Sequence, residues 1–278
     1  MSRRGGAALG SPIAHSLSPV LHQAAYDALG LSEWSFRTVE CTEDMLAATL
    51  RSLDEEGLAG VALTMPLKRR VVPLLAASDG RVQATAAANT VVFADGGWRG
   101  GNTDVPGIVA VLRSQGVDSA SVARPVILGA GATAGSALAA LAELGFTTSV
   151  VLARRPAATL EVVAVADRVG IAVEVGPWAA AAEVAGERLV ISTTPAGATD
   201  PLAIGLPATR GLLVDVVYAP WPTAFAAAWA DAGGRAVGGL ELLVEQAVEQ
   251  VRLLTGQAPP AEVLRTAGYA ALREREIG

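Results

Sequence analysis

Lys68 is the only lysine of the sequence, in which all the other basic side chains are arginines. It lies in the stretch LTMPLKRR, residues 63–70, directly before Arg69 and Arg70. A lysine in a partly desolvated site can release its proton, whereas an arginine stays protonated. We therefore interpret Lys68 as a candidate general acid and base, and the two arginines as solvated residues at a helix start. The alternative is that one lysine remains by chance in an arginine-rich sequence.

Residues 126–135, VILGAGATAG, form a glycine-rich turn between an apolar strand and a helix. The pattern has the form G-x-G-x-x-A, in which the first glycine allows a tight turn and the second lets the backbone approach a pyrophosphate. The start of the following helix then faces the negative charge. A purely structural turn is the alternative, but the strand before and the helix after favour a dinucleotide site. Its expected residues are Gly129, Ala130, Gly131, Ala132, Thr133 and Ala134.

The end of the next strand, LARRP, indicates which dinucleotide binds. A site for NAD usually has an acidic residue about twenty positions after the glycines, which bonds the ribose hydroxyls. This sequence has Arg154 and Arg155 there, and the next acid is Glu161. Guanidinium groups form charge-assisted bonds with a 2′-phosphate, so the sequence predicts NADP as the cofactor. The alternative is that one arginine, Arg155 rather than Arg154, only covers the rim of the sheet.

The stretch GSPIAHSLSPVLH, residues 10–22, places two hydroxyls, Ser16 and Ser18, in a turn before a helix. Together with the N–H groups of the helix start, they can bind a carboxylate. Ordinary helix capping is the alternative. We expect structural or hydrogen-bonding roles for His15 and His22. No His/Cys/Asp cluster has the spacing of metal ligands, so we expect no metal.

Strand and helix patterns alternate, which is typical of an α/β fold with parallel sheets. In the first part of the chain we expect strands in AALG, WSFRTVEC and GVALTMP, and a hairpin in NTVVFADGGWRGGNTD with its turn at Asp95-Gly96. A helix is expected after the first strand, closed by Gly30. A second is expected in TEDMLAATLRSLDEEG, with Thr42 as its N-cap and Gly57 as its end.

A second unit begins near residue 105. We expect its strands in RPVIL, TTSVVLARRP, IAVEVG, RLVISTTP and GLLVDVVYAP, and a helix after the glycine-rich turn. After GGRAVGG the pattern is helical, and a last helix is expected in PAEVLRTAGYAALRERE. The helix expected before it, in LELLVEQAVEQVRLLTG, has one apolar face, formed by Leu240, Leu243, Ala247, Val251 and Leu254.

The composition is that of a globular protein, with 51% hydrophobic and 17% charged residues among 278. The net charge of −6 and the pI near 5.1 argue against nucleic acid as a partner. Cys41 is the single cysteine, which excludes an internal disulfide and fits a reducing compartment. We find no apolar run long enough for a signal peptide or a transmembrane helix. We therefore expect a soluble, cytoplasmic protein without a membrane partner.

Nine motifs, in order over almost the whole chain, resemble those of the shikimate dehydrogenase family. ALTMPLK resembles the family's N-V-T-x-P-x-K, AANT its G-A-V-N-T, and GNTDVPGI its N-T-D-x-x-G. STTPAG resembles N-A-T-P-x-G, and DVVYAPWPT resembles D-x-x-Y-x-P-x-x-T. The remaining four are GSPIAHSLSP, GAGATAG, LARRP and LLVEQAVEQ.

The resemblance implies two α/β domains with the active site in the cleft between them. Residues 1–105 plus 239–278 would bind substrate, and residues 106–238 would form a Rossmann-type NADP-binding domain. The activity would be NADP-dependent interconversion of 3-dehydroshikimate and shikimate, in the biosynthesis of chorismate and aromatic amino acids. The chain would act on this small molecule as a monomer or homodimer.

The resemblance also implies roles for individual residues. Lys68 and Asp104 would be the catalytic pair, and Ser16 and Ser18 would hold the substrate carboxylate. The remaining substrate contacts would be Thr64, Asn89, Tyr218 and Gln246. Thr193 and Gly239 would join the glycine-rich turn and the arginines in binding the cofactor.

The sequence departs from the family's motifs at a few positions, mostly around the strand ends and the nicotinamide. They are Ala62, Ala153, Ser192-Thr193-Thr194, Glu241 and Leu242. We expect these departures to affect the affinity for the cofactor, whereas both residues of the acid–base pair are present. Two alternatives stay open: a quinate/shikimate or aminoshikimate dehydrogenase with the same residues, and a regulatory binding protein without turnover. A regulatory protein should lose the pair, whereas this chain keeps both Lys68 and Asp104.

Overall fold

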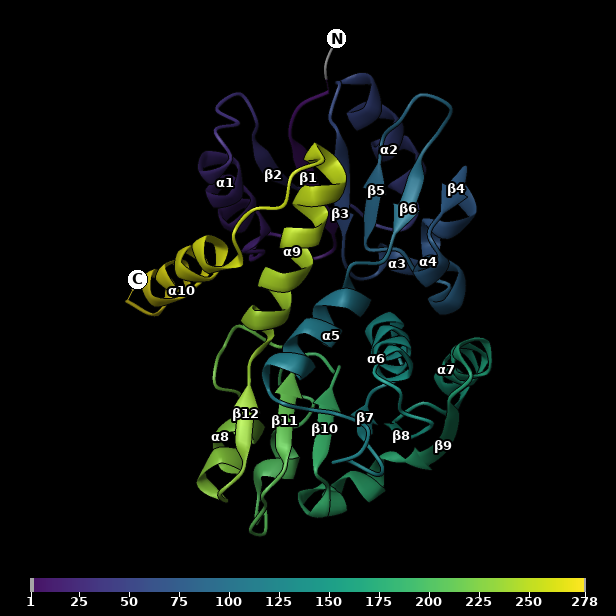
Figure 1. Ribbon diagram of the computed structural model, residues 1–278, viewed down its shortest axis with the longest axis vertical. Coiled ribbons are helices and arrows are strands. Elements are labelled where there is room, and N and C mark those ends of the chain that lie inside the picture. The colour runs from purple at the N-terminus through teal and green to yellow at the C-terminus, as the bar shows by residue number, and fades with distance from the viewer. Residues whose placement is uncertain (1–2, 278) are drawn as a thin grey trace. The chain divides into compact units, whose positions relative to one another are not determined.

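The computed structural model describes residues 3–277 (Figure 1). The chain forms two compact units: residues up to Gly107 together with those from Leu243 onward, and Ile108–Leu242. The chain passes between units inside α5 (Asp104–Ser114) and α9 (Gly239–Thr255). The first residues of α9, up to Leu242, belong to the second unit, and Gly239 N donates to Val217 O at 3.0 Å.

The first unit is built on a mixed six-stranded sheet with the order β2-β1-β3-β5-β6-β4. Strand β1 is parallel to β2 and β3, and β4 is parallel to β6, whereas β5 runs antiparallel to both β3 and β6. The predicted hairpin is confirmed as β5 and β6, and Gly97 N donates to Ala94 O at 3.1 Å across Asp95-Gly96. The strands are β1 (Gly6–Gly10), β2 (Phe36–Glu40), β3 (Gly60–Leu63), β4 (Ala77–Ser78), β5 (Thr90–Val92) and β6 (Arg99–Gly101).

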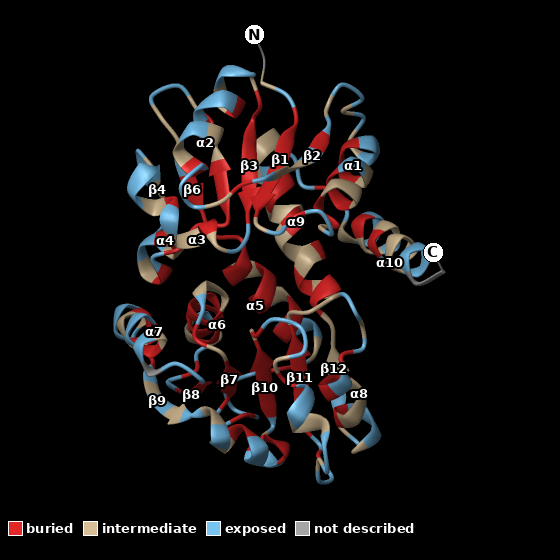
Figure 2. Ribbon diagram, turned by 180° about the vertical axis from the view of Figure 1, so that it is seen from behind, coloured by how far each residue is buried: buried red, intermediate tan, exposed pale blue. Residues whose placement is uncertain are grey.

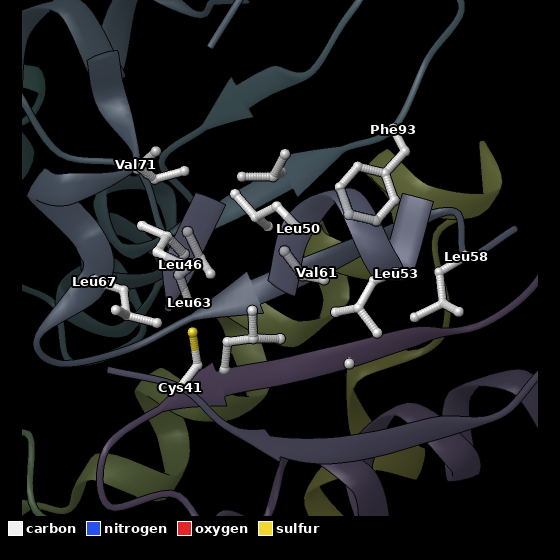
Figure 3. Close-up of a cluster of buried hydrophobic side chains, with 14 of the residues drawn as sticks. Cys41, Leu46, Leu50, Leu53, Leu58, Val61, Leu63, Leu67, Val71 and Phe93 are labelled. Carbon is white, nitrogen blue, oxygen red and sulfur yellow. The ribbon is translucent and has the colours of Figure 1, made fainter. Parts of the chain in front are cut away.

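Helices flank this sheet, and apolar residues at helical spacing face its core. Leu46, Leu50 and Leu53 of α2 gather with Val61 and Leu63 of β3 in one buried cluster (Figure 3). This spacing, three to four residues apart, is that of one helix face. The helices are α1 (Ser18–Ala28), α2 (Leu46–Glu55), α3 (Leu67–Arg70), η1 (Val72–Leu74), α4 (Gly80–Thr85) and α10 (Ala261–Ile277), with most of α9.

The predicted N-cap of α2 is wrong. The helix begins at Leu46, four residues after Thr42, and its N-cap is Met45. The Thr42 hydroxyl donates to the Asp44 carboxylate and so does not accept an N–H of the helix. A local side-chain bond has replaced the cap.

The second unit is a parallel six-stranded sheet with the order β12-β11-β10-β7-β8-β9. The five predicted strands are confirmed, and β12 is an additional strand within GGRAVGG, paired with β11. The strands are β7 (Val126–Leu128), β8 (Thr148–Ala153), β9 (Ala172–Pro177), β10 (Leu189–Ser192), β11 (Leu212–Asp215) and β12 (Arg235–Val237). The helices are α6 (Ala132–Glu143), α7 (Pro156–Val169), η2 (Trp178–Gly186), η3 (Asp200–Ala203) and α8 (Ala224–Asp231).

Strands β1, β3, β7, β10 and β11 are buried along their whole length (Figure 2). Parallel strands covered on both faces have this property, and it explains their continuous apolar sequences. The edge strands β2 and β9 contain exposed as well as buried or partly buried positions. Within residues 3–277, no helix is long and apolar enough to cross a membrane. The same part of the chain holds no group of three metal-ligating side chains.

Candidate functional site

Lys68 and Asp104 form an ion pair, with Nζ 2.6 Å from Oδ2. Lys68 belongs to the short helix α3 that follows β3, and Asp104 is the first residue of α5. The lysine side chain keeps 14% of its surface exposed, whereas that of the aspartate keeps 2%. Of the two partners, Lys68 is therefore the one that an incoming molecule can reach.

Asn89 connects this pair by hydrogen bonds to Thr103 and to Gln246 of α9. Its Nδ2 donates to Asp104 Oδ1 at 2.8 Å, and also lies 2.9 Å from Thr103 Oγ1 and 3.1 Å from Gln246 Oε1. Its Oδ1 accepts from the Thr103 N–H at 2.8 Å. Four residues expected at the site, Lys68, Asn89, Asp104 and Gln246, thus lie in one hydrogen-bonded group of the first unit.

The sheet brings these segments together at one edge. Leu63 N, at the end of β3, donates to Asn89 O at 2.7 Å, because β5 starts beside the end of β3. Ala88 N donates to Lys68 O at 2.8 Å, which fixes the lysine backbone next to Asn89. The β5–β6 pairing places Gly101 opposite Thr90, so the residues after β6 arrive at the same place.

Two residues of this group, Asn102 and Thr103, were not expected from the sequence. Asn102 Oδ1 accepts from the N–H groups of Asp104 at 3.1 Å and Val105 at 3.4 Å, so it caps α5. Thr103 fixes the orientation of the Asn89 amide through its N–H and its hydroxyl. An asparagine two positions before a helix is a recognisable cap signal, but the orienting role of Thr103 depends on a contact across the sheet.

Ser16 lies in the turn after β1 and Ser18 is the first residue of α1, and the Ser18 N–H donates to Ser16 Oγ at 3.2 Å. This turn adjoins the segment after β3, since Thr64 N donates to Leu9 O at 2.9 Å and Ser11 N to Met65 O at 3.0 Å. Thr64 is exposed at this edge. The two seryl hydroxyls, Thr64 and the Lys68 group are therefore all carried by segments at one end of the sheet.

His22, Arg69 and Arg70 differ in how far they are buried. His22 is fully buried and stacked on Phe36, with ring centroids 3.7 Å apart, and burial lowers its pKa to about 4. It is neutral at pH 7, which fits the structural role expected for it. Arg70 is solvated and paired with Glu43 at 3.0 Å. Arg69 is half-buried, so the expectation of a solvated side chain is wrong for this residue; its burial lowers the pKa of its guanidinium.

The glycine-rich turn of the second unit has the geometry of a phosphate cradle. Gly129 has φ of +105°, and a Cβ atom there would lie 2.7 Å from Thr193 Oγ1, so a larger residue would not fit. Thr193 is in turn held by its hydroxyl, which donates to Leu128 O at 2.8 Å. Gly131 is the N-cap of α6 and has no side chain with which to cap it, and a Cβ built on Gly131 would enter open space. This helix start can receive an anion.

The remaining residues expected to bind the cofactor lie in the same unit. Arg154 and Arg155 are both exposed directly after β8. Gly239 is required by packing, since a Cβ there would overlap the Val216 carbonyl oxygen. The second unit thus combines an open helix start with exposed cations, and these residues fit a dinucleotide with an additional phosphate. The place of Tyr218 beside the substrate stays a prediction.

Comparison with known proteins identifies the family to which this chain belongs. The family model described as "Shikimate dehydrogenase substrate binding domain" matches residues 8–91, and "Shikimate 5'-dehydrogenase C-terminal domain" matches residues 239–267. The shikimate dehydrogenase (NADP(+)) of Synechococcus sp. (strain JA-3-3Ab) is 32% identical, over 96% of this chain and 93% of its own. This chain belongs to the shikimate dehydrogenase family.

Solved structures of shikimate dehydrogenases have the same fold. The enzyme of Mycobacterium tuberculosis is 36% identical, with a TM-score of 0.84 over 96% of this chain and 99% of its own. The enzyme of Thermus thermophilus, solved in complex with NADP(H) and shikimate, is 32% identical, with a TM-score of 0.82 over 97% and 100% of the two chains.

Most departures from the family's motifs lie in the second unit, whereas Ala62 belongs to the strand of the first unit that leads to Thr64. Ala62 is buried in β3 between Ala8 and Thr90 of the neighbouring strands, and Ala153 is the last residue of β8. Ser192 ends β10 and bonds Thr194 through their hydroxyls at 3.3 Å. The pair and its supporting amide are therefore complete in this member of the shikimate dehydrogenase family.

Proposed function

We propose that the protein catalyses the NADP-dependent, reversible reduction of 3-dehydroshikimate to shikimate, a step in the biosynthesis of chorismate and aromatic amino acids. The observation that carries the proposal is the Lys68–Asp104 pair at 2.6 Å, supported by Asn89 and Gln246. A chain that had kept the fold only as a binding protein would have no need to preserve this arrangement. Family membership supplies the substrate class.

The chemistry requires a hydride on the ring carbon and a proton on the ring oxygen. NADPH, when bound, supplies the hydride. Lys68, as an ammonium group, would bond the ketone oxygen, stabilise the negative charge that develops there and donate the proton. In the direction of oxidation, a neutral Lys68 would accept the proton of the hydroxyl.

Asp104 would orient the lysine. Its Oδ2 accepts from Lys68 Nζ and its Oδ1 from Asn89 Nδ2, so both oxygens have a partner before substrate arrives. A carboxylate held in this way fixes the direction of the ammonium group, and catalysis benefits because the geometry is set in advance. Asn89 and Gln246 would bond the hydroxyls of the ring from the same group.

The remaining assignments follow the two units. Residues 1–105 with 239–278 would bind the substrate, with Ser16 and Ser18 at its carboxylate and Thr64 at a hydroxyl. Residues 106–238 would bind NADP(H) through the turn at Gly129–Ala134, Thr193 and the two arginines, and Tyr218 would reach the substrate. The enzyme would act in the cytoplasm as a monomer or homodimer.

The test is the appearance of reduced-nicotinamide absorbance when the purified protein meets shikimate, with NADP⁺ and NAD⁺ in parallel and quinate as the second substrate. Fast reduction with shikimate and NADP⁺ alone is the expected result. Turnover that prefers quinate or NAD⁺ would contradict the assignment of substrate or cofactor. No turnover with any pair, despite binding of nucleotide, would leave a regulatory protein as the function.

A further inference from the structure

Trp178 lies beside Arg154 in the second unit, and the sequence motifs give it no role. The guanidinium carbon of Arg154 lies 6.0 Å from the centroid of the Trp178 ring. At this distance a cation is attracted by the negative face of an indole. Within residues 3–277, Arg154 forms no ion pair with a carboxylate, so its charge is not neutralised by the protein.

The register of the sheet brings the two residues together. Strands β8 and β9 are parallel neighbours, and their last paired residues are Ala153 and Pro177. Arg154 and Trp178 are the next residues of the two strands, so they leave the sheet at the same level and on adjacent strands. Their contact is therefore set by backbone pairing and does not depend on a flexible loop.

The tryptophan is a fixed support for the arginine. Trp178 is half-buried and packs against the apolar cluster of the unit, which includes Leu152 and Ala181. Arg154 is exposed and, on its own, would sample many rotamers. A rigid aromatic face beneath the guanidinium restricts that freedom before any ligand binds, which lowers the entropic cost of binding.

We propose that Trp178 positions Arg154 for the ribose 2′-phosphate and thereby sets the preference for NADP over NAD; this rests on the cofactor proposed above. Trp178 is a positioning residue, which acts through Arg154. It strengthens the binding of the additional phosphate of NADP and does not change the binding of the part that NAD shares with NADP. A tryptophan that only covered the edge of the sheet would affect both nucleotides alike.

The test compares the Kd of NADP⁺ and of NAD⁺, measured by calorimetry on the purified protein, for the native chain, Trp178→Leu and Trp178→Phe. Trp178→Leu should weaken NADP⁺ binding about 3–10-fold, the loss expected for a partly exposed cation–π contact, and change NAD⁺ binding less than about twofold. Trp178→Phe keeps an aromatic face and should recover most of the loss. Added salt should reduce the difference between the variants for NADP⁺.

The matched control is Leu206→Ala, because Leu206 is another half-buried residue on the same apolar cluster. It should leave the ratio of the two Kd values unchanged even if it lowers stability. Should Trp178→Leu fail to fold, as judged by circular dichroism, Trp178→Met is the second non-aromatic variant, since methionine fills irregular apolar space.

Equal weakening of NADP⁺ and NAD⁺ in the non-aromatic variant would overturn the proposal, as would unchanged binding of NADP⁺. A native protein that binds NADP⁺ but does not oxidise shikimate would refute the proposed function alone, because the binding comparison does not depend on turnover. A native protein that binds neither nucleotide would refute both.

Discussion

Replacing Lys68 by methionine separates the proposed role of the Lys68–Asp104 pair in catalysis from its contribution to stability. Methionine keeps most of the volume of the side chain but neither donates a proton nor carries charge. General acid–base catalysis by one side chain contributes about 10²–10⁴ in rate, so kcat of Lys68→Met should fall by about that factor. KM should change less, because the residues proposed to bind the substrate, Ser16, Ser18, Asn89 and Gln246, remain.

The same change leaves Asp104 without its partner at Oδ2, although that carboxylate is only 2% exposed. Removing one member of a buried pair costs about 3–5 kcal/mol in general. Here Asn89 still donates to Oδ1, and water can enter beside the position of the lysine, which is 14% exposed. We therefore expect a loss of about 3 kcal/mol in the free energy of unfolding, at the lower end of that range.

The double variant Lys68→Met/Asp104→Asn tests whether the loss of stability comes from the unpaired carboxylate, separately from the loss of turnover. Neutralising Asp104 removes the unpaired charge, so the double variant should regain about 1–2 kcal/mol of the free energy of unfolding. It should regain no turnover. The control is Arg70→Met, which removes a solvated cation of the same short helix; stability should change by less than about 0.5 kcal/mol and turnover should not change.

Initial rates of nicotinamide reduction give kcat and KM, and urea unfolding gives the free energies. Lys68→Arg is the decisive further variant, because it keeps the charge but cannot exchange the proton. If Lys68→Arg turned over shikimate at a near-native rate, the acid–base role of Lys68 would be wrong. If the double variant were no more stable than Lys68→Met, the unpaired carboxylate would not be the source of the loss.

Three further predictions concern the framework of the site. Burial lowers the pKa of His22 from 6.5 to about 4, so the unfolded chain binds a proton in this window that the folded chain does not. The free energy of unfolding should thus fall by about 3 kcal/mol as pH drops from 6.5 to 4, and His22→Leu should lack this component in urea titrations at both pH values. A Cβ on Gly60 would overlap the Val91 carbonyl oxygen, so Gly60→Ala should lower stability by about 2–3 kcal/mol, whereas Gly80→Ala, which enters open space, should lower it by less than about 0.5 kcal/mol in the same assay. Thr223 is the N-cap of α8, so Thr223→Ala should lower the free energy of unfolding by about 2 kcal/mol and Thr223→Ser should lower it much less. Equal thermal stability of the two variants would contradict the capping role.

The local elements of this chain were largely predictable. Strand and helix periods, the glycine-rich turn and the Asp95-Gly96 hairpin depend on neighbouring residues, and the structure has them where the sequence indicates. The predictions were wrong or incomplete where a contact with another residue or strand overrides the local sequence pattern. Thr42 has the chemistry of an N-cap, yet its hydroxyl bonds Asp44, and the short strand in GGRAVGG forms only because β11 lies beside it.

The sequence by itself determined the chemistry available to this protein: one lysine among arginines, a dinucleotide turn, and basic residues in place of the acid that NAD sites use. These are properties of residue types at short spacing. The tertiary structure decided which of them meet. Asn89 and Gln246 are 157 positions apart and bond at 3.1 Å, and Thr103 turns the Asn89 amide toward Asp104. The contacts among Asn89, Thr103 and Asp104 follow from the pairing and register of β5 and β6, and that of Gln246 from the place of α9; no local pattern encodes either.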